Sequence, residues 1–162
     1  MYTPESPQYY LHRAFDGTSA YSGVPFRAED CFDGGMNDLI YGHNMNNGTM
    51  FHDLLKYADE DFYREHPMVQ FDTMEGSGRY EVLAAFYSEV YEKEEEGVFR
   101  YYQCTDLSDP EHYDEYLDRV EEVALYDTGV TAQFGDQLLT LTTCSYHTDN
   151  GRFVLVARRM ED

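Results

Sequence analysis

The amino-acid sequence predicts a mainly β protein, a mixed β-barrel of about seven to eight strands with two main helices. Several runs are rich in Val, Leu, Thr, Phe and Tyr, which suit a pleated and half-buried strand, and turn residues separate many of them. Two other segments are typical of helices. A chain of 162 residues has the usual size of one compact domain and is long enough to bury a core.

The two expected helices divide the expected strands into three groups. The short helix is expected at residues 51–57. Residues 109–123 form the longer one, because they combine an acidic start, Pro110 at the first turn, and apolar or aromatic residues at helical spacing. In chain order, the strands are expected at residues 24–29, 38–43, 68–74, 79–91, 98–103, 137–143 and 152–157.

The last two strands carry a cysteine and an arginine in a suggestive arrangement. Cys144 ends the first of them, and Arg152 begins the second. The loop between them ends in Asp-Asn-Gly, which is a turn signal. If the strands pair antiparallel across this loop, the two residues stand opposite each other and project from the same face of the sheet.

A histidine completes a set of groups that is sufficient for thiol acyl transfer. His43 follows Ile40-Tyr41-Gly42 at the end of another expected strand. Arg152 stays charged at any working pH and would stabilise the oxyanion of the tetrahedral intermediate. His43 would protonate the leaving amine and deprotonate the incoming one.

Each of the three residues also has an ordinary structural explanation. Cysteine is among the most buried residue types, so Cys144 alone would more often fill a core than attack a substrate. Arg152 alone would be a solvated strand residue, and His43 a turn histidine bound by the backbone. Their co-occurrence with the flanking patterns favours the catalytic interpretation.

Composition narrows the classes of partner. The formal net charge of -21 argues against nucleic acid and anionic lipid headgroups. The acidic residues 92–96 predict a solvated loop, because they lack the alternating spacing of a cation site.

Cys144 and His147 resemble half of a zinc site, but no second half follows, so no metal is expected. If Cys144 is catalytic it is free, and Cys31 and Cys104 are either buried thiols or a disulfide.

Segments along nearly the whole chain match a known family in order and spacing. They lie at residues 7–13, 40–45 with the short helix after them, 71–73, 80–82, 125–130, 140–144 and 152–157. Together these segments resemble class B sortases, the cysteine transpeptidases of Gram-positive bacteria. The resemblance implies a sortase-type closed β-barrel, with a short helix after the histidine motif and a longer helix before the cysteine strand.

The resemblance also implies an activity. Such an enzyme cleaves a C-terminal sorting signal of a secreted protein after threonine, holds a thioester, and transfers it to an amine of the cell-wall precursor or of a pilin. The signal would be an Asn-Pro or Ser-Pro type pentapeptide ending in Thr-Asn, Thr-Gly or similar. By motif position, Cys144 is the nucleophile, His43 the acid and base, and Arg152 the stabiliser of substrate and oxyanion. No cofactor is implied.

Four further residues are candidates for the substrate groove by the same resemblance. Thr142 stands where class B members often carry a serine, and the others are Asn44, Leu141 and Thr143. Some class B enzymes have an acidic residue two positions after the cysteine, where this chain has Tyr146. That departure argues against a carboxylate partner for His43.

The family pattern implies a single catalytic domain over residues 1–162 that lacks the family's N-terminal anchor, its N-terminal helices and part of the first strand. The full-length protein would act at the extracellular face of the cell membrane or in the cell wall, and only the anchor would contact the membrane. The uncovered edge of the barrel would be a place for a second copy to bind.

Two functions from different classes follow. The favoured one is an active cysteine transpeptidase, and the alternative is a catalytically impaired sortase fold that serves as a binding or assembly module. A thiol hydrolase would differ from the first only in that water resolves the acyl-enzyme.

Overall fold

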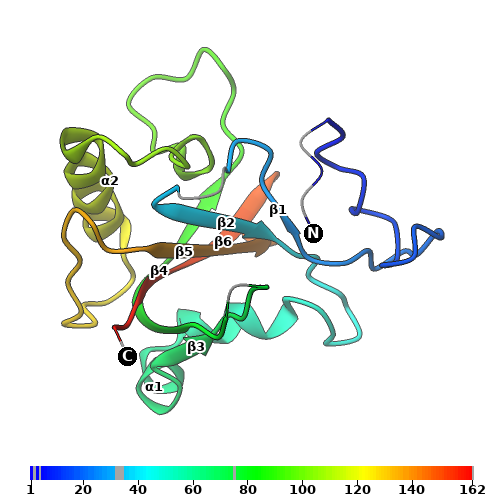
Figure 1. The fold of residues 1–162 in the computed structure, drawn as a ribbon, viewed down its shortest axis with the longest axis horizontal. Helices are drawn as coiled ribbons and strands as arrows, with labels where there is room; N and C mark the ends of the chain where they lie inside the picture. The colour runs from blue at the N-terminus through cyan, green and yellow to red at the C-terminus, as the bar shows by residue number, and fades with distance from the viewer. Residues whose placement is uncertain (2, 4, 32–34, 75, 162) are drawn as a thin grey trace.

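The computed structural model describes residues 1, 3, 5–31, 35–74 and 76–161. Its centre is one mixed six-stranded sheet with the strand order β1-β2-β5-β6-β4-β3 (Figure 1). β2 and β5 pair in parallel, and the other neighbouring strands pair antiparallel. The strands are β1 (Phe26–Arg27), β2 (Asn37–Tyr41), β3 (Met68–Gln70), β4 (Arg79–Glu89), β5 (Leu138–Cys144) and β6 (Gly151–Arg159).

Helical segments lie on both sides of this sheet (Figure 1). The long helix is confirmed as α2 (Pro110–Val123), and the Asp109 side chain caps it by accepting from the backbone N–H groups of Glu111 and His112. The predicted short helix is the 3-10 helix η1 (His52–Ala58). The sequence analysis missed two short segments, α1 (Glu60–Glu65) and η2 (Tyr101–Gln103).

The mainly β fold is confirmed, but the closed barrel is not. β1 and β3 are the two edges of the sheet, and no pairing joins them within the described ranges. The sheet is therefore a curled half-barrel with six strands instead of seven to eight. The first and third strands are also shorter than the predicted ranges 24–29 and 68–74.

The strand predicted at residues 98–103 is wrong. Residues 101–103 form η2, and residues 98–100 belong to no strand. The Tyr101 ring packs edge-on against Phe86 with ring centroids 6.0 Å apart, and Phe99 packs against Tyr116 of α2. These aromatic residues fill the space between sheet and helix. A residue with high strand propensity is one that packs well on a half-buried surface. Propensity therefore does not distinguish a paired strand from aromatic side chains that fill the space between a sheet and a helix.

Two apolar layers hold the helices to the sheet. On one face, Tyr113, Tyr116 and Val120 of α2 pack against strand residues such as Leu39 and Val154. On the other face, side chains of η1 pack against a second set of strand residues. Because both faces are covered, β6 has a continuous buried run over residues 153–157. The sheet is therefore packed on both faces, and its strand ends carry the groups described below.

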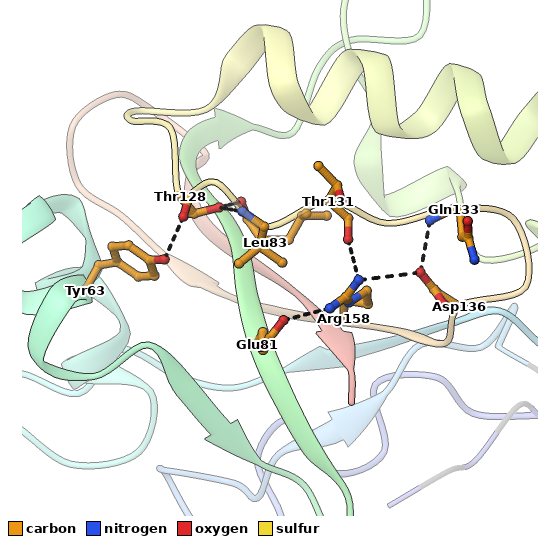
Figure 2. A network of polar contacts seen from close by, with 9 residues as sticks. Tyr63, Glu81, Leu83, Thr128, Thr131, Gln133, Asp136 and Arg158 are labelled. Atoms are coloured by element: carbon orange, nitrogen blue, oxygen red, sulfur yellow. Dashed lines mark hydrogen bonds and ion pairs between the residues drawn. The ribbon is translucent and has the colours of Figure 1, made fainter. Parts of the chain in front are cut away.

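The connection from α2 into β5 is fastened to the sheet by a polar network (Figure 2). Arg158 of β6 lies at its centre. Its Nη2 contacts Glu81 Oε2 at 2.7 Å, and its Nη1 donates to the Thr131 carbonyl at 2.7 Å. The Thr128 hydroxyl donates to the Leu83 carbonyl at 2.8 Å. These contacts fix the point at which the chain enters the cysteine strand.

None of the helices in the described ranges is both long and apolar enough to cross a bilayer.

Candidate active site

The predicted pairing of the last two strands is confirmed. β5 and β6 are antiparallel, and Cys144 lies opposite Arg152 in the register. Between them the chain turns through Asn150, which has a φ of 56°, and Gly151, whose backbone leaves no room for a side chain beside the Ser145 carbonyl. The cysteine and the arginine therefore come from one local hairpin.

The histidine reaches the same place through the parallel pairing of β2 with β5. Tyr41, the last residue of β2, is in register with Thr142, so His43 and Cys144 each lie two residues further along. Two hydrogen bonds continue the alignment beyond β2: Gly42 N–H donates to the Thr142 carbonyl at 3.1 Å, and the Thr143 hydroxyl donates to the Gly42 carbonyl at 2.7 Å. Neighbouring parallel strands end at one edge of the sheet, which brings the two groups together.

A groove of about 550 Å³ lies at this edge. It contains the thiol, the imidazole and the guanidinium, together with the predicted Thr142 and Thr143. Part of its lining comes from the N-terminal segment, and another part comes from η2. The other lining residues include Pro7, Gln8, Leu11, Tyr41, Tyr101, Tyr102 and Gln103. The lining also includes the acidic residues Glu29 and Asp30, so an extended peptide would meet apolar and aromatic side chains together with charges of both signs.

The Arg152 guanidinium is anchored by its own turn. Its Nη1 donates to the carbonyls of Asn150 at 3.1 Å and of Gly151 at 2.9 Å. A guanidinium has five N–H donors, so these two bonds leave others for a substrate. The side chain is half-buried at the groove, where a lowered local dielectric strengthens the attraction between a cation and an anion.

The His43 ring is held from the N-terminal segment. Its Nε2 lies 2.7 Å from the Leu11 carbonyl oxygen, and its face stacks on the His12 ring with centroids 5.4 Å apart. Its partner is thus a backbone carbonyl. Tyr146, at the position where some class B enzymes have an acidic residue, is 74% exposed in the loop after β5.

Comparison with known proteins identifies the family of this chain. Residues 24–160 match the Sortase domain family.

The chain belongs to the sortase family.

Its relatives confirm the class B resemblance. The chain is 33% identical over 153 residues to sortase B of Listeria monocytogenes, an alignment that covers 91% of this chain and 58% of the relative. It is 27% identical over 124 residues to sortase B of Staphylococcus aureus, covering 75% and 48%. This sortase chain therefore spans about half the length of the curated relatives it matches. The crystal structure of Clostridium perfringens sortase B superposes with a TM-score of 0.82 at 28% identity, over 94% of this chain and 81% of that one.

Two of the predicted groove residues lie elsewhere in this sortase. Leu141 packs in the apolar layers against η1, on the face of β5 opposite to Thr142 and Cys144, because successive strand residues alternate between faces. Asn44 donates from Nδ2 to the Cys144 carbonyl at 3.0 Å, and its Oδ1 lies 2.7 Å from His52 Nδ1. Asn44 thus fastens the loop after His43 to the cysteine strand and does not line the groove.

The sequence analysis missed the tyrosines of the groove. Tyr101 and Thr142 are both buried, and their side-chain oxygens lie 2.8 Å apart. Burial raises the pKa of Tyr41 to about 12, although the nearby Arg152 opposes the shift, and burial likewise raises the pKa of Tyr101. Both rings therefore remain neutral phenols. The position of Tyr41, two residues before the histidine on one strand face, was a signal in the sequence that would have identified it.

The remaining cysteines of this sortase are thiols. Cys31 and Cys104 are both unpaired, which decides between the two alternatives for them. Burial raises the pKa of the Cys31 thiol, and burial together with the Glu115 carboxylate raises that of Cys104 to about 11. Both are therefore poor nucleophiles at neutral pH. In the described part of the chain, no group of three or more His, Cys, Asp or Glu residues is arranged to hold a metal.

Proposed function

We propose that this chain is the catalytic domain of a cysteine transpeptidase that cleaves a C-terminal sorting signal after threonine and transfers the acyl group to an amine. The observation that carries the proposal is the convergence of Cys144, His43 and Arg152 on one groove through two strand pairings. Buried thiols elsewhere in the chain lack this environment. The proposed site of action is the extracellular face of the membrane or the cell wall.

In the first half-reaction, Cys144 Sγ attacks the carbonyl carbon of the threonine, and the carbonyl oxygen becomes an oxyanion. Arg152 stabilises that charge from the opposing strand. The carbon–nitrogen bond then breaks, and the proton on His43 passes to the leaving amine. The products are a thioester on Cys144 and the free C-terminal fragment of the substrate.

In the second half-reaction, an amine attacks the thioester and loses its proton to His43. The carbon–sulfur bond breaks, and the Cys144 thiolate leaves while a new amide forms. A structure of sortase B complexed with triglycine, which superposes on this chain with a TM-score of 0.81 at 25% identity, supports binding of an amine-bearing peptide in such a fold. The amine would come from the cell-wall precursor or from a pilin.

Thr142 and Thr143 have distinct roles in this scheme. The Thr142 hydroxyl is buried and paired with the Tyr101 hydroxyl, which fastens η2 to β5 beside the groove. Thr143 holds the backbone before His43 through its bond to Gly42. We propose that the first shapes the substrate groove and that the second keeps the histidine in register with the cysteine.

The test is intact mass spectrometry of the protein with a small library of sorting-signal pentapeptides, of the Asn-Pro and Ser-Pro types, with and without an added amine. The expected result is a mass increase equal to the peptide's N-terminal part, absent in Cys144→Ala and present in the matched variant Cys104→Ala. Discharge faster by amine than by water supports a transpeptidase, and discharge by water alone supports a thiol hydrolase. No adduct from any peptide, in a folded protein, would instead favour a binding or assembly module.

A further inference from the structure

The N-terminal segment makes a closed loop whose base lies against His43. Val24 N–H donates to the Tyr10 carbonyl at 3.2 Å, and Ala20 N–H donates to the His12 carbonyl at 3.0 Å, so the two arms of the loop are joined. The loop belongs to the end of the sheet toward which β2 and β5 point (Figure 1). It delivers the Leu11 carbonyl to the edge of the histidine ring and the His12 ring to its face.

The contact with Leu11 decides which ring nitrogen carries a proton. A carbonyl oxygen has only lone pairs, so the 2.7 Å contact is a hydrogen bond only if Nε2 bears hydrogen. The neutral ring has one N–H group, which leaves Nδ1 with a free lone pair. In the imidazolium form both nitrogens bear hydrogen, and the bond from Nε2 to Leu11 persists. The carbonyl therefore suits both charge states and leaves Nδ1 as the nitrogen that changes.

We infer that the Leu11 carbonyl and the stacked His12 ring are positioning groups that keep His43 in its Nε2–H form, so that Nδ1 is the atom that accepts and returns the proton. The tautomer does not depend on the proposed function. The role of Nδ1 in acyl transfer rests on the proposed function. This arrangement takes the place of a carboxylate partner. A carbonyl orients the ring without adding a negative charge beside it.

The proton movements balance with Nδ1 in this role. Nδ1–H of the imidazolium gives its proton to the leaving amine nitrogen as the carbon–nitrogen bond breaks. The neutral Nδ1 then takes one proton from the incoming amine as the new amide forms, which restores the starting imidazolium and the Cys144 thiolate. The other proton stays on Nε2 throughout, hydrogen-bonded to the Leu11 carbonyl oxygen.

Gly23 offers a way to move the Leu11 carbonyl without touching His43. It has a φ of 55°, and a Cβ at this residue would lie 2.4 Å from the carbonyl oxygens of both Leu11 and Tyr10. Both clashing atoms are backbone, so Gly23→Ala must displace the carbonyl. Gly17 in the same loop also has a positive φ, of 82°, but its Cβ would meet only the Tyr9 hydroxyl at 3.2 Å. Gly17→Ala is therefore the matched control, since it adds similar backbone strain and spares the carbonyl.

The first experiment is nitrogen-15 NMR of the histidine rings in the protein without substrate, above the pH at which His43 becomes neutral. The His43 signals are identified by their loss in His43→Ala. In the wild type and in Gly17→Ala, Nε2 is expected as the protonated nitrogen and Nδ1 as the unprotonated one. In Gly23→Ala a mixture of the two tautomers is expected. A wild-type His43 protonated at Nδ1 would overturn the inference.

Kinetics supply the second readout. Displacement of a group that orients a reacting atom costs about ten- to a hundredfold in rate, so Gly23→Ala is expected to slow acyl-enzyme formation by that factor and Gly17→Ala to leave it near normal. His12→Ala should slow it about two- to tenfold, and His12→Phe, which keeps a ring over His43, should recover most of the loss. A folded Gly23→Ala with the wild-type tautomer and rate would refute the positioning role.

The outcomes separate this inference from the proposed function. If the Nε2–H tautomer is found and no peptide forms an acyl-enzyme, the positioning of the ring by Leu11 is supported. The transpeptidase activity and the role of Nδ1 in it are then both refuted. If acyl-enzyme forms and His43 is protonated at Nδ1, the transpeptidase activity is supported and the positioning role of Leu11 and His12 is refuted. Should Gly23→Ala fail to fold, the wild-type spectrum and the His12 pair still decide between these results.

Discussion

Arg152→Ala is the substitution that most directly probes the proposed chemistry. It removes the guanidinium opposite Cys144 and leaves the strand register to the backbone of β5 and β6. Loss of one oxyanion partner costs about a hundred- to a thousandfold in turnover, or roughly 3–4 kcal/mol of transition-state stabilisation. We therefore expect acyl-enzyme formation to slow by at least about a hundredfold.

The same substitution should change stability little. Arg152 donates to two carbonyls of its own turn, and both lie at a loop where water is able to replace it. Hydrogen bonds of this kind contribute about 0.5–1.5 kcal/mol each, so a total loss of about 1–2 kcal/mol is expected. In a chain of this length that corresponds to a fall in Tm of about 2–8 °C.

Quenched single-turnover mass spectrometry measures the acylation rate, and thermal unfolding measures the stability of the same samples. Arg152→Lys keeps a positive charge but loses the planar fork, and an intermediate rate is expected. Arg159→Ala, at the exposed end of the same strand, is the matched control and should acylate normally. If Arg152→Ala acylated at a near-normal rate in a folded protein, the oxyanion role would be refuted.

Three further predictions concern stability. Thr142→Val should lower the free energy of unfolding by about 1–3 kcal/mol, because it leaves the buried Tyr101 hydroxyl without its partner. Chemical denaturation measures this free energy, and an unchanged value would contradict the pairing. Arg158→Met should lower the free energy of unfolding by about 1–2 kcal/mol, since its ion pair with Glu81 and its bond to the Thr131 carbonyl are part-exposed. Arg159→Met should lower it by less than about 0.5 kcal/mol, and equal losses in the two variants would argue against the network. The pKa of Cys104 is raised, so the unfolded chain loses this proton first and stability should fall as pH rises from about 9 to about 11. Cys104→Ala should flatten that part of the pH profile, and an unchanged slope would contradict the burial effect.

Local sequence signals predicted the elements whose causes are local. The turn residues between the last two strands sufficed to predict that Cys144 faces Arg152. The cap at Asp109 and Pro110 sufficed for α2, because helix starts depend on side chains within one turn. The same reasoning failed at residues 98–103, where a run of β-formers packs as aromatic filler between sheet and helix.

The groove shows the same division. Thr142 and Thr143 line the groove, whereas Leu141 packs in the apolar layer beside η1. Asn44 was a candidate for the substrate groove, and in the structure its side chain donates to the Cys144 carbonyl, a partner 100 residues away. Such contacts depend on which strands become neighbours, and no local pattern near Asn44 states that.

By itself, the sequence determined that Cys144 stands opposite Arg152 and that a helix precedes the cysteine strand, because short-range turns and caps specify both. Only the tertiary structure decided that β2 lies in parallel beside β5, which brings His43 to Cys144. It also decided that the Leu11 carbonyl meets the histidine ring. Parallel strands have no turn between them to set their register, so packing of both sheet faces, over the whole chain, has to set it.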